Sequence, residues 1–273
     1  MHELIIEANR AERQYWRDLW RYRELFYVLA WRDLAVRYKQ TVIGVAWALI
    51  RPLLTMVVFT VVFGRIAKLP SEGAAPYAVM VYAAMLPWQF FSTALSESSN
   101  SLIGNANLIS KVYFPRLIVP AGSVITSFVD FLIAFVILMA MSAWYSFWPD
   151  SRIVFLPLFV FLCFALAIGA GLWLCALNVK YRDFRYIVPF IVQFGLYVSP
   201  VGFSSSVVPD QWRLLYSLNP VVGVIDGFRW ALLRGESQLY WPSLVASIVM
   251  TVVLCVTGAW YFRRTERTFA DVI

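Results

Sequence analysis

The sequence has 273 residues, of which 61% are hydrophobic and only 14% are charged, and its mean hydropathy is +0.69. Soluble domains carry roughly 25% charged residues, so this composition excludes a soluble globule and predicts a polytopic membrane protein. The net charge of +7 at pH 7 would also suit a nucleic-acid-binding protein. The positions of the 23 Lys and Arg residues therefore have to decide what the charge means.

The chain begins with a polar, charged segment, residues 1–41, in which aromatic side chains alternate with arginines. Tyr15, Trp16, Leu19, Trp20 and Phe26 recur at spacings near three and four. This spacing predicts one amphipathic helix over 12–39, lying in the cytoplasmic interface with its arginines toward anionic headgroups or phosphates. A plain membrane anchor and a guide for an anionic lipid-linked substrate both fit the pattern. The charged, aromatic start is unlike a cleavable signal peptide.

Six apolar segments follow, at 42–63, 76–95, 117–147, 153–178, 187–203 and 240–262. A membrane-spanning helix needs about 20 residues, a length that the fifth segment barely approaches. The stretch between the fifth and sixth segments is broken at Asn219-Pro220 and carries Asp226 and Arg229. It predicts two short re-entrant helices within about 207–236, in which Asp226 and Arg229 could pair at a spacing of three.

The basic residues are distributed unevenly between the two sides of the membrane. With the N-terminus placed inside, sixteen of the 23 Lys and Arg residues fall on the cytoplasmic side. This asymmetry predicts cytoplasmic N- and C-termini and no nucleic-acid partner. The expected organisation is a cytoplasmic segment 1–41, a transmembrane domain 42–262 and a cytoplasmic tail 263–273.

The scarce reactive residues argue against catalysis in this chain. His2 is the only histidine, and Cys163, Cys175 and Cys255 each lie in an apolar run, so neither a metal site nor Cys-His chemistry is expected. Asp130 is alone at membrane depth, which predicts a structural polar contact and not a proton relay. No G-x-x-x-x-G-K-[ST] phosphate loop occurs, so transport would be powered by a partner or by a gradient.

The polar stretch 96–116 is too hydrophilic to span a membrane, yet its Leu and Ile residues recur at helical spacing. It predicts a short amphipathic cytoplasmic helix that ends before Pro115, and both a connecting loop and a docking element fit it. Aromatic residues make up 17% of the chain, which suits interfacial belts and packing or a path on which sugar rings stack and slide.

Several motifs follow one another along the chain: WRDLAVRYKQTVIGVAWALIRPLL, VFTVVFGRI, LPWQFF, LISKVYFPR, LNVKYRDFRYIVPF, SPV and LNP. Together they resemble the membrane subunit of ABC-2 type polysaccharide exporters, the Wzm/TagG family. The resemblance implies an all-α fold with an N-terminal interface helix, six transmembrane helices and re-entrant periplasmic helices before the last span. It also implies a homodimer that works with two copies of a separate ATPase, which would bind the ATP and Mg²⁺, so no cofactor is expected in this chain.

The resemblance also implies roles for particular residues. Residues matching the coupling helix and the ATPase interface are Asn107, Leu108, Ile109, Lys111, Phe114, Pro115, Arg116 and Asp183. The positive charge expected to meet a lipid headgroup comes from Arg32, Arg37, Lys39 and Arg51. Candidate channel aromatics are Trp47, Phe59, Phe63, Trp88, Phe90, Phe91, Phe194 and Tyr197.

The function expected from these features is the permease half of an ATP-driven exporter in the bacterial inner membrane. Its expected cargo is a lipid-linked polysaccharide such as undecaprenyl-diphosphate-linked O-antigen, with capsule or teichoic acid chains as the nearest alternatives. A small-molecule ABC-2 exporter is a further alternative. A proton-coupled transporter would show several membrane carboxylates and inverted repeats, and an intramembrane enzyme would show clustered acid-base residues.

Overall fold

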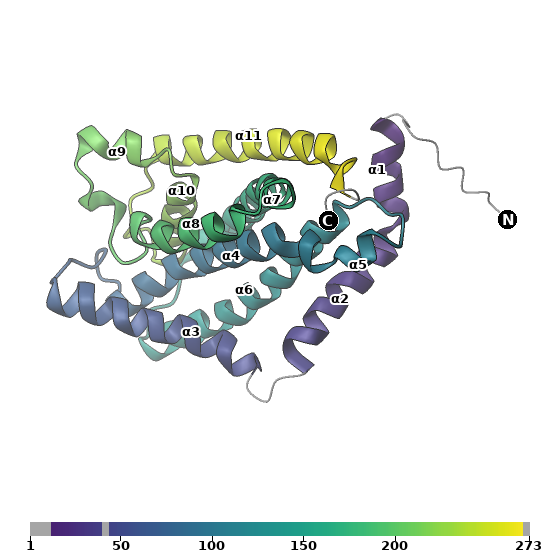
Figure 1. The fold of residues 1–273 in the computed structure, drawn as a ribbon. Coiled ribbons are helices and arrows are strands. Elements are labelled where there is room, and N and C mark those ends of the chain that lie inside the picture. The colour runs from purple at the N-terminus through teal and green to yellow at the C-terminus, as the bar shows by residue number, and fades with distance from the viewer. Residues whose placement is uncertain (1–11, 40–43, 270–273) are drawn as a thin grey trace.

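The computed structural model describes residues 12–39 and 44–269, which form helices joined by turns and short loops, with no strand among them (Figure 1). The α-helices are α1 (Glu12–Arg21), α2 (Arg23–Lys39), α3 (Gly44–Phe59), α4 (Tyr77–Gly104), α5 (Ala106–Ile109), α6 (Ile118–Trp144), α7 (Leu156–Lys180), α8 (Phe184–Val198), α9 (Asp210–Tyr216), α10 (Pro220–Leu232) and α11 (Trp241–Glu266). A helix satisfies its backbone hydrogen bonds internally, as a bilayer requires. The predicted all-α fold is confirmed.

The central helix of the bundle is α4, which packs against α3, α6, α7, α8 and α10. Its most apolar 18-residue stretch is 83% buried, whereas the corresponding stretches of α6, α7 and α11 are 28–33% buried. The helices α1, α2 and α5 lie with the C-terminal end of α11 at one end of the molecule, and α9 lies at the other (Figure 1). The outer helices therefore leave broad apolar faces uncovered by this chain.

Four helical segments of the described chain are long and apolar enough to cross a membrane: Tyr77–Gly104, Ile118–Trp144, Ser151–Lys180 and Trp241–Glu266. The other two predicted spans are also helical but shorter. The first is α3, which continues into a π-helical stretch over Thr60–Ile66, and the fifth is α8, with only 15 residues. Four of the six predicted spans thus meet the length requirement on their own.

The N-terminal segment differs from the single interface helix that the periodicity predicts. It forms two helices, with Tyr22 as the turn residue between them. Each helix follows a different partner: Tyr15 of α1 contacts Arg263 at the end of α11, whereas α2 packs along α6. Since one straight helix could not follow both surfaces, the change of direction comes from tertiary packing.

The predicted coupling segment, 96–116, also differs from expectation, because α4 continues through it to Gly104 and leaves only the four-residue α5 as a separate helix. The serines in this part of α4 bond back to carbonyls of their own helix, as Ser99 does to Ser96 at 2.8 Å. Asn178 of α7 donates to the Ser99 carbonyl at 2.9 Å. Satisfied in this way, polar side chains enter the bundle, so their polarity was a misleading sign that the second apolar helix ends at residue 95.

The two short helices predicted before the last span are α9 and α10, and α9 lies at the end of the molecule opposite α1 and α5 (Figure 1). The break between α9 and α10 lies at Asn219-Pro220, where the Asn219 side chain caps α10 by accepting from the Val221 N–H at 3.1 Å. Arg229 of α10 is fully buried and pairs with Glu72 at 3.4 Å, in place of the expected Asp226. It also donates to the Val201 and Phe203 carbonyls, so it fixes two loops onto α10.

Candidate functional site

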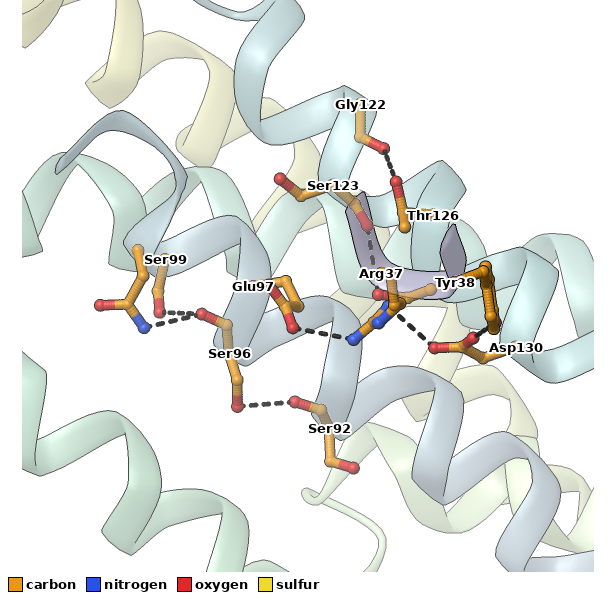
Figure 2. A network of polar contacts seen from close by, with 12 residues as sticks. Arg37, Tyr38, Ser92, Ser96, Glu97, Ser99, Gly122, Ser123, Thr126 and Asp130 are labelled. Atoms are coloured by element: carbon orange, nitrogen blue, oxygen red, sulfur yellow. Dashed lines mark hydrogen bonds and ion pairs between the residues drawn. The ribbon is translucent and has the colours of Figure 1, made fainter. Parts of the chain in front are cut away.

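A cluster of charged side chains joins the interface helix α2 to the bundle. The Arg37 guanidinium lies 2.9 Å from Glu97 of α4 and 2.8 Å from Asp130 of α6. The neighbouring Tyr38 hydroxyl donates to the same Asp130 carboxylate (Figure 2). Asp130 therefore has the structural polar contact that its isolation predicted, and Arg37 bridges two core helices from the last turn of α2.

The Tyr38 hydroxyl stays protonated over a wide pH range. Burial and the hydrogen bond to Asp130 raise the pKa of Tyr38 above its ordinary value, because both oppose a second negative charge beside that carboxylate. Around this cluster, Ser96, Ser99 and Thr126 donate to carbonyls of their own helices (Figure 2). These hydroxyls are therefore already satisfied within their own helices, so α2 is joined to the bundle here by the ion pairs of Arg37 and the Tyr38–Asp130 hydrogen bond.

Two polar cavities flank Arg37. The smaller has a volume of about 180 Å³ and is lined on its polar side by Arg37, Tyr38, Arg51, Gln89, Thr93 and Asp130. The larger, of about 540 Å³, is lined by Arg32, Asp33, Glu97, Asn100, Asn105 and Thr126 among others. Each cavity combines cationic and anionic side chains, so neither concentrates the positive charge that would attract an anion at a distance.

The four basic residues expected to meet a lipid headgroup differ in their availability. Arg32 is 2.7 Å from Asp33 and donates to Asn105 at 2.7 Å, and Arg37 is held by its two carboxylates. Lys39 and Arg51 are exposed, and in the described part of the chain neither forms an ion pair. An anionic group could thus meet Arg51 beside the smaller cavity without first breaking an ion pair.

The predicted coupling residues separate into a buried set and an exposed set. Ile109, Phe114 and Pro115 are buried within this chain, and Arg116 bonds to Glu266 at the end of α11. Asn107, Lys111 and Asp183 are exposed, and Leu108 is half-buried. Val112 and Tyr113, which sequence reasoning did not select, are 49% and 63% exposed, so we define the exposed set Asn107, Ser110, Lys111, Val112 and Tyr113 as the coupling surface.

The candidate channel aromatics also separate by burial. Phe59, Trp88, Phe90 and Phe91 are at most 9% exposed and pack in the core, and Phe63 is half-buried. The side chain of Trp47 lies outside the described part of the structure. Phe194 and Tyr197 are 53% and 61% exposed on α8, so of the eight candidates only these two are shown to have largely open faces.

Sequence reasoning missed two further aromatics on α8. Tyr186 and Phe190 are 82% and 57% exposed, and the rings of Phe190 and Phe194 lie 4.2 Å apart. With Tyr197 they recur at intervals of four and three, which places them along one side of the helix. We call these four residues, Tyr186, Phe190, Phe194 and Tyr197, the α8 aromatic stripe; the same spacing was already visible in the sequence.

The described residues offer no site for a metal ion. Over 12–39 and 44–269, no three His, Cys, Asp or Glu side chains gather where they could bind one. The arrangement instead combines a polar cluster where α2 meets α4 and α6 with a short exposed segment after α4.

A family model described as "ABC-2 type transporter" matches residues 24–233. The chain belongs to the ABC-2 type transporter family. Members similar to this chain include the O-antigen export system permease protein RfbA of Myxococcus xanthus, 25% identical over 94% of this chain and 98% of that protein. The RfbA protein of Klebsiella pneumoniae is 24% identical over 92% and 95%. The polysialic acid transport protein KpsM of Escherichia coli is 22% identical over 86% and 91%.

Proposed function

We propose that this ABC-2 protein is the membrane-spanning permease of an ATP-driven exporter of lipid-linked polysaccharide, with undecaprenyl-diphosphate-linked O-antigen as its cargo. The observation that carries the proposal is the match to O-antigen export permeases over more than nine-tenths of this chain. Such coverage includes the interface helices, the bundle and the last span. In this proposal the protein is a multi-pass subunit of the bacterial inner membrane, and the distribution of its basic residues supports cytoplasmic termini.

ATP hydrolysis belongs to a separate partner in this proposal, because the sequence contains no phosphate-loop motif. Two copies of the permease and two copies of the ATPase form the complex, and the ATPase subunits bind ATP and Mg²⁺. The coupling surface supplies the docking face, since its side chains are exposed beside a buried anchor of Ile109 and Phe114. Exposed Asp183, at the start of α8, lies on the other cytoplasmic loop and extends the contact.

The cargo would meet two different surfaces. Lys39 and Arg51 offer charge to the lipid diphosphate, whereas Arg32 and Arg37 can take part only after leaving their carboxylates. The glycan would follow exposed rings such as the α8 aromatic stripe, because a sugar's C–H face stacks on an aromatic ring in many registers. The apolar faces around this stripe would lie against the second permease copy or lipid.

The deciding experiment is reconstitution into vesicles. The permease alone should hydrolyse no ATP, whereas the permease with its partner ABC ATPase should hydrolyse ATP and translocate undecaprenyl-diphosphate-linked glycan. Hydrolysis by the permease alone, or hydrolysis by the complex without glycan movement, would contradict the proposal.

A second candidate cargo is a capsule chain, because the polysialic acid transport protein matches 86% of this chain. The same vesicles loaded with capsule or teichoic acid chains on their own lipid carriers distinguish the alternatives. If one of those chains is translocated faster than the O-antigen glycan, that chain becomes the assigned cargo.

A further inference from the structure

Glu266, the last residue of α11, connects two segments that lie 150 residues apart in the sequence. Its carboxylate accepts a hydrogen bond from the Arg116 backbone N–H at 2.8 Å. In return, the Arg116 guanidinium donates to the Glu266 backbone carbonyl. A carboxylate that accepts from a backbone N–H makes one of the stronger hydrogen bonds in proteins, so the end of the last span holds the chain just after the coupling surface.

The N-terminal helix joins the same contact. The Arg263 guanidinium of α11 lies 4.5 Å above the Tyr15 ring, which brings α1 close to the Glu266 carboxylate. Burial and the Glu266 charge raise the pKa of Tyr15 above its ordinary value, so the hydroxyl remains a neutral donor. Helix α1, the coupling segment and α11 thus meet at one carboxylate.

Beneath this polar contact lies an apolar one. Phe262 and Phe269 are fully buried, with ring centroids 5.3 Å apart. They share a cluster with Ile109 and Phe114, which are the buried neighbours of the coupling surface. The coupling segment therefore rests on the C-terminal end of α11 as well as on α4.

We propose that this C-terminal clasp, made of Glu266, Phe262 and Phe269, positions the coupling segment and passes its movement to α11. Helix α5 has four residues, which is too short to hold a conformation without tertiary contacts, and the clasp supplies those contacts. Helix α11 packs along α7 and, near its other end, against α10. A displacement of the coupling segment would therefore reach the opposite end of the bundle through the last span. The transport part of this inference rests on the proposed function.

The clasp can first be tested on the full-length permease alone, by trypsin cleavage after the exposed Lys111. Glu266→Ala should speed this cleavage about tenfold, since losing one charge-assisted hydrogen bond shifts local opening by that much. Arg267→Ala, which changes the exposed next residue, should leave the rate unchanged. Equal rates in wild type and Glu266→Ala would overturn the clasp, whatever the protein transports. If Glu266→Ala yields no protein, the same measurement is made on Glu266→Gln. The glutamine side chain has the shape of glutamate but carries no charge.

The second test uses the complex of the permease with its partner ABC ATPase. The Glu266 variant should co-purify with the ATPase and hydrolyse ATP at the wild-type rate, while glycan export per ATP falls below the wild-type level, because a larger share of turnovers finds the clasp open. Export per ATP at the wild-type level would reject the role in transmission. A wild-type complex that moves no glycan would reject the proposed function and leave the cleavage result as the test of the clasp.

Discussion

Arg37 forms the two ion pairs that join α2 to α4 and α6. Its removal would leave Glu97 and Asp130 facing each other without the cation between them. Because the Arg37 side chain is 30% exposed, the expected loss is about 1–2 kcal/mol, below the cost of breaking a fully buried pair. Arg37→Ala should lower the melting temperature in detergent and expose α2 to protease, whereas Arg23→Ala, an exposed change on the same helix, should do neither. If Arg37→Ala leaves the melting temperature unchanged, Arg37 does not stabilise the attachment of α2.

Phe114 and Tyr113 are adjacent, yet they should respond differently to substitution. Phe114 is 3% exposed and Tyr113 is 63% exposed. Phe114→Asp should cost about 3–5 kcal/mol of stability by burying a charge, whereas Tyr113→Ala should leave stability unchanged. Tyr113→Ala should weaken ATPase binding about tenfold or more, because exposed tyrosines often dominate interfaces. Melting curves measure the stability and co-purification measures ATPase binding, with Trp144→Ala as the exposed control. If Tyr113→Ala binds the ATPase as well as wild type does, Tyr113 is not part of the docking face.

Among the helices, α8 carries the clearest surface for a sugar chain. Changing Tyr186, Phe190 and Phe194 together to Leu keeps the helix apolar but removes three rings of the aromatic stripe. The complex should assemble and hydrolyse ATP, while glycan export falls about tenfold if each lost ring contact contributes about 0.5 kcal/mol, the low end of aromatic contacts. Phe161→Leu on α7, where the ring is 68% exposed, should leave export unchanged. Unchanged export in the triple variant would place the glycan elsewhere.

The helices show how far sequence reasoning could reach. Apolar length and turn residues predicted every long helix and the break at Asn219-Pro220, because these signals are local. The extension of α4 to Gly104 could not be predicted, since it depends on Asn178 of α7 meeting the Ser99 carbonyl. The same holds for the site: the motif LISKVYFPR marked the coupling segment, but buried Phe114 differs from exposed Tyr113 because it belongs to an apolar cluster formed with distant residues such as Phe262 and Phe269.

At the scale of the whole molecule, the basic residues and the fold suggest the same orientation. The end that gathers α1, α2, α5 and the C-terminal end of α11 contains most of the Lys and Arg residues (Figure 1). Helix α8 rises only about 22 Å over its 15 residues, less than the roughly 30 Å of a bilayer core. It therefore needs neighbouring protein or a locally thinned bilayer to complete its path, as expected for a helix beside a second subunit.

The orientation itself can be tested with single cysteines and a membrane-impermeant maleimide. Cys163 and Cys175 are buried and should not react, and Cys255 is changed to Ala because it is only half-buried. Tyr113→Cys should react only when the reagent reaches the cytoplasmic side, because Lys111 and the basic N-terminal helices belong there. Leu214→Cys on α9, 65% exposed, should react only from the opposite side. Labelling of both positions from one side would contradict the orientation, since α5 and α9 lie at opposite ends of the bundle (Figure 1).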